Sequence, residues 1–401
     1  MRLSPRLLLS VSLVLPLFSP AAEEKPAPPI AFSDIPSPVN RRPVGISVTT
    51  APDGAAWLSW IESDEHANYA LKFSTFNLAA NQWSSPGSIV RGVPFLAFEW
   101  PEYFPTLAVG ENGRATAVWF VGHAAHNVER AAFVSQTLDG GKKWDNARPL
   151  TREETTSIEF AALVTLADGR VLAAWIDGRD FEKREKRVMQ LFARVLGESG
   201  PDLLIDPSMP RFSRLSLSAF PDGGALLAYH GLNDDQRITV RTARFKGRAW
   251  DESRTLDPDV GRATGPRLAS DGGRVAAAWF TAADNAPRVL ASFSPDAGTR
   301  FLLPLRMDRG KPVGHVDTLI LRDGAMLVTW LETDGSLWLR RITPDFTADE
   351  PIALAPAGTL SVKTNPRLAL LRDYAGGTEP VQLLATFATD TALRTLLVTV
   401  P

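Results

Sequence analysis

One short unit recurs along the chain and limits the folds that the chain can adopt. Each copy has a β-rich run, an Asp-Gly or Asn-Gly pair, and a second β-rich run that ends in an aromatic residue. Xaa-Gly pairs between β-rich runs are typical of hairpins, and a repeat of this length is typical of propeller blades. The aromatic residues follow one another at intervals of 50–59 residues, and they are Trp60, Trp119, Trp175, Tyr229, Trp279, Trp330 and Phe387.

The number of copies predicts an all-β fold, a β-propeller with seven blades; six blades are the alternative count. A β-sandwich would explain short strands and turns, but not seven units of this length. We expect the propeller to occupy residues 44–401 as about seven four-stranded units. The hairpin pairs are Asp53-Gly54, Asn112-Gly113, Asp168-Gly169, Asp222-Gly223, Asp271-Gly272 and Asp323-Gly324, with a looser seventh at residues 373–377.

The N-terminal residues predict export. Arg2 and Arg6 precede an apolar stretch over residues 7–18, and small residues follow it, so residues 1–21 are typical of a signal peptide. The apolar stretch is too short to span a bilayer. Residues 22–43 form a Pro-rich lead-in. Because the last unit is one strand short, a strand near residues 30–32 is expected to close the ring. We expect a periplasmic or secreted protein without a membrane span.

The composition narrows the chemistry. The chain has no cysteine, which excludes disulfides, thiolate metal sites, a cysteine nucleophile and a lipidated cysteine. Its formal net charge of −2 indicates no general attraction to nucleic acid. We expect no metal and no cofactor, a carbohydrate or protein ligand, and a monomer.

Two segments share the pattern Ser/Thr-x-Asp-x-Gly-x-x-aromatic. In a hairpin turn the Asp accepts hydrogen bonds from turn amides, the Gly supplies a positive φ, and the aromatic ring packs beneath the turn. We call these two segments the box segments. Their defining residues are Thr137, Asp139, Gly141 and Trp144 in the first, and Ser294, Asp296, Gly298 and Phe301 in the second.

The box segments resemble the Asp-box, or BNR repeat, of the sialidase (neuraminidase) superfamily, in particular its bacterial exported sialidase-like members. The resemblance implies a β-propeller in which the boxes are structural and lie away from the active site. It also implies a glycosidase of exo-α-sialidase type that acts on acidic sugars. Functional residues are then expected on the opposite face, around the propeller axis.

The same resemblance implies catalytic residues. The family's general acid follows the second strand of the first unit, where this chain has Asp64. The family's nucleophile is a tyrosine backed by a glutamate. At the tyrosine position of the matching motif this chain has His315, and the glutamate corresponds to Glu159.

The resemblance further implies arginines that hold a sugar carboxylate. Arg41 begins an Arg-x-Pro motif before the first unit, Arg179 follows Trp175, and Arg262 is the third candidate. Asp317 lies in the same motif as His315 and is a fourth substrate-binding candidate.

Two functions remain open. The first is a sialidase-type hydrolase with an incomplete or altered catalytic set. The second is a non-catalytic propeller that binds a glycan, peptide or protein partner on its axial face. The missing tyrosine and the incomplete arginine set favour the second. Three arginines that converge on the axis would be expected of the first.

Overall fold

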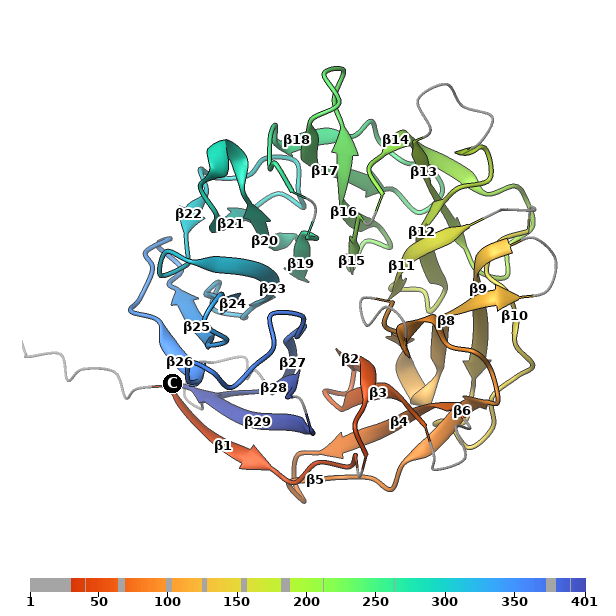
Figure 1. Cartoon of the computed structure of the whole chain (residues 1–401), viewed down its shortest axis with the longest axis horizontal. Helices are drawn as coiled ribbons and strands as arrows, with labels where there is room; N and C mark the ends of the chain where they lie inside the picture. The colour runs from red at the N-terminus through yellow and green to blue at the C-terminus, as the bar shows by residue number, and fades with distance from the viewer. Residues whose placement is uncertain are drawn as a thin grey trace, which may run out of the picture.

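The computed structural model describes residues 30–39, 41–63, 69–98, 103–124, 128–152, 157–181, 188–211, 213–262, 264–372, 380–389 and 391–401. Seven antiparallel sheets surround a central axis (Figure 1). The predicted seven-bladed β-propeller is therefore confirmed. The helices among the described residues are short 3-10 turns, and none is long and apolar enough to cross a membrane.

Each blade runs from an inner strand at the axis to an outer strand at the rim. Blade 1 contains β2 (Val44–Thr50), β3 (Ala56–Ser63), β4 (Tyr69–Asn77), β5 (Gln82–Trp83) and β6 (Gly87–Arg91). Blade 2 contains β7 (Thr106–Val109), β8 (Ala115–Ala124), β9 (Val128–Thr137) and β10 (Arg148–Pro149). Blade 3 contains β11 (Ile158–Thr165), β12 (Val171–Asp177), β13 (Met189–Val195) and β14 (Leu203–Met209).

The remaining blades repeat this order. Blade 4 contains β15 (Leu215–Ala219), β16 (Ala225–Leu232), β17 (Ile238–Phe245) and β18 (Arg254–Asp257). Blade 5 contains β19 (Arg267–Asp271), β20 (Arg274–Thr281), β21 (Arg288–Ser294) and β22 (Leu305–Arg306). Blade 6 contains β23 (Pro312–Ile320), β24 (Met326–Glu332), β25 (Leu337–Ile342) and β26 (Ile352–Ala355). The short helices lie in loops of other blades, and they are η1 (Leu96–Phe98), η2 (Glu111–Gly113) and η4 (Ala283–Asn285).

Blade 7 joins the two ends of the chain. It contains β27 (Arg367–Arg372), β28 (Val381–Ala388) and β29 (Leu393–Val400), and β1 (Ala31–Ile35) forms its outer strand. β1 lies beside β29 (Figure 1), and the register runs from Ala31 opposite Thr399 to Ile35 opposite Thr395. Asp34 also accepts three hydrogen bonds from the Arg394 guanidinium, at 2.7–3.0 Å. The segment before blade 1 thus closes the ring.

The core is divided among the interfaces between neighbouring blades. The recurring aromatic of each unit lies on the second strand of its blade and is at most 1% exposed. A buried indole or phenol still needs a partner for its polar edge. Trp60, Trp175 and Trp330 donate to the carboxylates of Glu62, Asp177 and Glu332, two residues along the same strand, at 2.8–3.0 Å. Tyr229 and Trp279 donate to Asp206 and Asp257 at 3.0 and 2.8 Å.

The two box segments form the same hydrogen-bonded turn. In the first, the Thr137 hydroxyl donates to Asp139 at 2.8 Å and accepts from the Gly141 amide at 3.0 Å, and the Lys143 amide donates to Asp139 at 3.0 Å. These hydrogen bonds, from Lys143 first and then from Thr137, lower the pKa of Asp139.

The second box segment repeats these contacts. Ser294 donates to Asp296 at 2.9 Å, and the amides of Gly298 and Arg300 donate to Ser294 and Asp296 at 2.9 and 2.8 Å. Both box glycines have a positive φ and approach the preceding blade closely. A Cβ at Gly141 would lie 2.2 Å from Phe73, and one at Gly298 would lie 2.5 Å from Leu226.

Hydrogen bonds also show which turns share a face. The Gly140 amide donates to the Gly113 carbonyl at 3.1 Å, and the Ala297 amide donates to the Gly273 carbonyl at 2.6 Å. The box turns therefore lie beside the first hairpins of their own blades. We call this side the box face. We call the other side, at which the inner strands begin, the entry face.

Deletion of residues 22–38 removes β1 and leaves the rim of blade 7 unpaired. We expect the melting temperature to fall by at least about 5 °C, because a whole hydrogen-bonded strand and the buried Ile35 are lost. Asp34→Ala is the matched control. It removes only the exposed ion pair to Arg394, which contributes at most about 1 kcal/mol. Equal melting temperatures for the deletion and the wild type would contradict ring closure by β1.

Candidate functional site

Three arginines from different blades line one cavity on the propeller axis. Arg214 immediately precedes β15, Arg267 begins β19, and Arg367 begins β27. All three line an axial cavity of about 140 Å³. Inner strands of a propeller begin around one axis, so residues far apart in sequence meet there.

The strand register explains why two of these arginines are equivalent. Arg267 lies opposite Ala278, and Arg367 lies opposite Thr386. Each of these partners directly precedes the recurring aromatic of its blade. Because side chains alternate between the faces of a strand, equivalent positions in two blades point in equivalent directions. Asp317 has the corresponding position in blade 6, opposite Thr329.

The three arginines differ in their partners. The Arg267 Nε donates to Asp317 at 2.9 Å, and the other carboxylate oxygen of Asp317 accepts from the Leu368 amide at 2.9 Å. Arg214 donates to the Asn365 side-chain oxygen at 2.6 Å. Asp317 thus neutralises Arg267 and ties blade 5 to blades 6 and 7.

Arg367 is the exceptional member of the cluster. It is 4% exposed, and its one hydrogen bond within the described part of the chain goes to the Pro366 carbonyl at 3.5 Å. Burial, with the nearby Arg267 and Arg214, lowers the pKa of Arg367 to about 9, although Asp317 acts in the opposite direction. No carboxylate among the described residues lies within ion-pair distance of its guanidinium. A buried cation without an anionic partner is costly.

The opposite wall of the cavity is aromatic and hydroxylic. Phe104 and Phe160 line it, together with Ser47 and Thr106. The Arg367 guanidinium lies 4.6 Å from the Phe104 ring centre, and Arg214 lies 5.7 and 5.9 Å from the rings of Phe104 and Phe160. Cation–π contacts of this kind partly stabilise a desolvated guanidinium. The cavity therefore offers positive charge on one side and apolar surface on the other.

His315 lies beside this cluster, on β23, with a positive φ of 55°. Its Nδ1 is 2.8 Å from the same Asn365 oxygen that Arg214 contacts. Burial and then Arg214 lower the pKa of His315 to about 4, against the opposing effect of hydrogen bonds to Asn365 and the Val362 backbone. The imidazole is therefore neutral at pH 7 and its contacts are those of an anchored side chain.

Glu159 is fully buried at the start of β11. Its Oε1 lies 3.4 Å from Arg130 and 3.3 Å from Arg211, so it makes two ion pairs. Arg130 also lies 5.7 Å from the Tyr103 ring, which stacks on Phe160 of the axial cavity. Glu159 thus lies behind the aromatic wall, while His315 contacts the arginine side.

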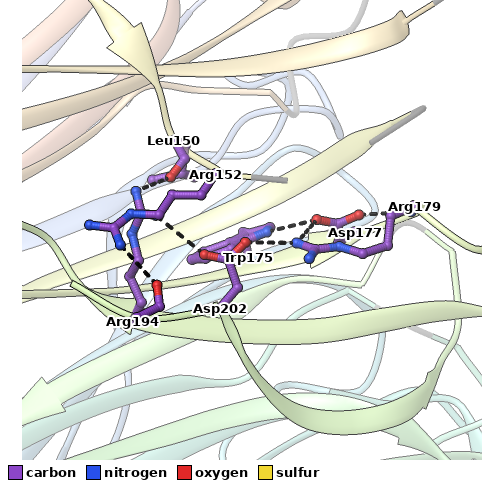
Figure 2. A network of polar contacts seen from close by, with 8 residues as sticks. Leu150, Arg152, Trp175, Asp177, Arg179, Arg194 and Asp202 are labelled. Atoms are coloured by element: carbon purple, nitrogen blue, oxygen red, sulfur yellow. Dashed lines mark hydrogen bonds and ion pairs between the residues drawn. The ribbon is translucent and has the colours of Figure 1, made fainter. Parts of the chain in front are cut away.

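Arg179 belongs to a separate polar network in blade 3, shown in Figure 2. Its Nη2 lies 2.7 Å from Asp177 and 2.9 Å from Asp202. Burial alone lowers the pKa of Arg179, but the two carboxylates outweigh it and raise the pKa. Asp177 also accepts from Trp175, and Asp202 lies 3.3 Å from Arg194 (Figure 2). Arg179 is therefore paired with two carboxylates and lies apart from the axial arginines.

The other predicted residues lie apart from the cluster or outside the described residues. Arg41 is exposed before β2, and Arg262 is exposed in the link that precedes β19. Asp64 falls outside the described residues. Within the described ranges, no three His, Asp or Glu side chains come close enough to hold a metal ion.

The sequence analysis missed Arg214, Arg267 and Arg367, although a signal for two of them exists. Two near-identical pentapeptides stand at the start of two units, and they are Gly265-Pro-Arg-Leu-Ala and Asn365-Pro-Arg-Leu-Ala. Phe104-Pro-Thr-Leu-Ala repeats the pattern with threonine in place of arginine. An alignment of the units on their aromatic residues would have placed these side chains at one level of the axis.

No family model and no curated protein matches this sequence. Among solved structures, the chain is similar to the BP39L lectin from Burkholderia pseudomallei, with a TM-score of 0.57, 11% identity, and coverage of 90% of this chain and 100% of the lectin. It is also similar to a polysaccharide lyase of family PL25, an ulvan lyase, with a TM-score of 0.56, 12% identity, and coverage of 90% and 96%.

A Hadza microbial sialidase, Hz136, matches with a TM-score of 0.49 and 12% identity over 72% of this chain. The chain spans 63% of that sialidase chain. At these identities, the similarities to the lectin and the lyase show the β-propeller fold and nothing more specific.

Arg367→Met should stabilise the ligand-free protein at pH 7. The pKa of Arg367 is lower in the folded state than in the unfolded chain, so its charge opposes folding at every pH below about 9. At pH 7 the free energy of unfolding of the variant should exceed that of the wild type by more than about 1 kcal/mol. Above pH 9 the folded wild type loses this proton, and the advantage should shrink. Urea unfolding of the variant and the wild type at pH 7 and pH 10 measures the difference in stability at each pH. A variant that is less stable at pH 7 would contradict the assignment.

Proposed function

We propose that the protein binds an acidic saccharide in its axial cavity, with the anionic group of the sugar held by Arg367 and Arg214. The observation that carries the proposal is the buried Arg367 guanidinium, which has no carboxylate partner among the described residues. An anionic ligand would supply the missing partner and recover part of the desolvation cost. A guanidinium also presents paired donors that match a carboxylate.

The aromatic wall supports a sugar as the carrier of that anion. Phe104 and Phe160 face the cavity from the side opposite the arginines, and Ser47 and Thr106 add hydroxyl groups. A saccharide has apolar C–H surfaces and hydroxyl groups on one ring, and aromatic side chains pack against such surfaces.

Binding without catalysis is the first candidate. A sialidase-type reaction needs a nucleophile and a base that activates it. His315 is neutral and hydrogen-bonded to Asn365, and Glu159 is engaged in ion pairs with Arg130 and Arg211. Three arginines on the axis are also expected of a hydrolase, but Arg214, Arg267 and Arg367 are not the arginines that the resemblance implies, and Arg267 already pairs with Asp317.

Hydrolysis of exo-α-sialidase type is the second candidate, and one observation favours it. Arg42 and Pro43 of the Arg-x-Pro motif line a second pocket on the entry face, and this pocket shares Phe104 with the axial cavity. This position of the motif supports the second candidate. In this reading Asp64 acts as the acid, Glu159 activates a nucleophile at His315, and Arg41 contacts the substrate.

We also propose that residues 1–21 are a signal peptide and that the mature protein is a monomer in the periplasm or outside the cell. The apolar stretch after Arg2 and Arg6 supports this location. The intact mass of protein recovered from its native host should correspond to a chain that begins at Ala22. A mass that includes residues 1–21 would contradict the proposal.

Calorimetric titration with glucuronate, N-acetylneuraminate and neutral glucose tests the first candidate. We expect the wild type to bind an acidic sugar and not glucose, because the neutral sugar leaves Arg367 without an anion. Arg367→Met should weaken binding at least about tenfold. Arg248→Met, which changes an exposed arginine on the box face, is the matched control and should bind as the wild type does.

Two results would contradict binding as the sole function. Equal affinity for glucose and glucuronate, or no effect of Arg367→Met, would show that the axial arginines are not the binding site. Turnover of a fluorogenic sialic acid glycoside that is lost in both Asp64→Ala and His315→Ala would instead establish the hydrolase.

A further inference from the structure

A second pocket adjoins the axial cavity on the entry face. It also has a volume of about 140 Å³, and it lies between the segment before β2 and the segment before β27. Phe104 lines both cavities, so its ring forms the common wall. Asn365, which contacts Arg214 at the axial cavity, lines the second pocket as well.

The charged side chains that line the two cavities are all positive. The axial cavity is lined by Arg214, Arg267 and Arg367, and the second pocket by Arg42 and Lys363. No Asp or Glu lines either cavity among the described residues. The whole chain has 43 basic and 45 acidic residues, so this segregation does not follow from composition. A surface lined by one sign of charge raises the local concentration of the opposite charge.

The volumes bear on the size of the ligand. Pockets that enclose a whole drug-sized ligand have volumes of roughly 300–1,000 Å³. Either cavity alone is smaller than this range, and each is suited to one small unit of a larger molecule. Two adjoining compartments with the same sign of charge fit a ligand that repeats both its size and its charge.

The wall between the compartments depends on close backbone packing. Gly45, at the base of the second pocket, has a φ of +59°. A Cβ at this position would lie 3.0 Å from Pro105 and 3.3 Å from the Cα of Phe104. Blade 1 can therefore approach blade 2 closely enough to hold Phe104 in place only because residue 45 has no side chain.

We infer that the second pocket is a subsite for the neighbouring unit of the ligand, which is an oligosaccharide that carries a negative charge on adjacent units. The inference rests on the proposed function, because the first unit occupies the axial cavity. Its charged group contacts Arg214 and Arg367. The second unit lies on the other side of Phe104, where Arg42 and Lys363 face its charge.

Titration with galacturonic acid and with its dimer and trimer tests this inference. We expect the dimer to bind about tenfold more tightly than the monomer, and the trimer to add little. In Arg42→Ala/Lys363→Ala the gain from monomer to dimer should disappear, while the affinity for the monomer should stay unchanged. The gain should also decrease at high salt, because Arg42 and Lys363 are exposed.

Lys143→Ala/Arg248→Ala is the matched control, since it removes two exposed cations from the box face and should retain the gain. Equal affinities for monomer and dimer, or a gain that survives in Arg42→Ala/Lys363→Ala, would overturn the second subsite and leave the axial site intact. If neither monomer nor oligomers bind to the wild type, the inference fails together with the proposed axial site.

Discussion

The fold depends on burial of one aromatic side chain per blade, and in five of the seven blades the polar edge of that side chain donates to a carboxylate. Trp60, Trp175 and Trp330 each donate to a carboxylate two residues further along the strand. Hydrogen bonds to charged acceptors contribute roughly 1.5–3 kcal/mol, and the rings themselves supply most of the apolar contact between blades. The carboxylates of Asp177 and Glu332 therefore stabilise the fold as hydrogen-bond acceptors for the buried indoles.

Closure of the ring brings the inner strands of all seven blades together around one axis, and the candidate site forms there. β1 pairs with β29, and the seven inner strands then begin around one axis. Arg214, Arg267 and Arg367 meet there, although 153 residues separate the first from the last in the printed sequence. Asp317 neutralises Arg267, but Arg367 stays buried without a carboxylate in the described chain. The packing of seven blades is large enough to hold this unfavourable charge in place.

The fold could be predicted because its signals are local. The recurring unit that ends in Trp60 to Phe387 and the Xaa-Gly hairpins depend on residues close in sequence, and they predicted the number of blades. The box turns could be predicted for the same reason, since Thr137, Asp139 and Gly141 contact one another within one turn.

The candidate site could be predicted only in part. His315 and Asp317 were placed near the axis by their motif, but their partners Asn365 and Arg267 lie 50 residues away in neighbouring blades. The resemblance to sialidases implies that Arg179 binds substrate. Its two carboxylate partners could not be foreseen, since Asp202 approaches it only after β13 and β14 have paired. Contacts between strands and between blades follow from register and ring closure, which no short motif specifies.

The most direct test of the account is a crystal structure of the protein soaked in sodium bromide, with bromide located by its anomalous scattering. The central claim is that the axial cavity attracts anions because Arg367 has no anionic partner there. The account predicts a bromide in the cavity, in contact with Arg367 and Arg214, and its loss in crystals of Arg367→Met. Bromide found only on the outer surface, with an empty axial cavity, would contradict it.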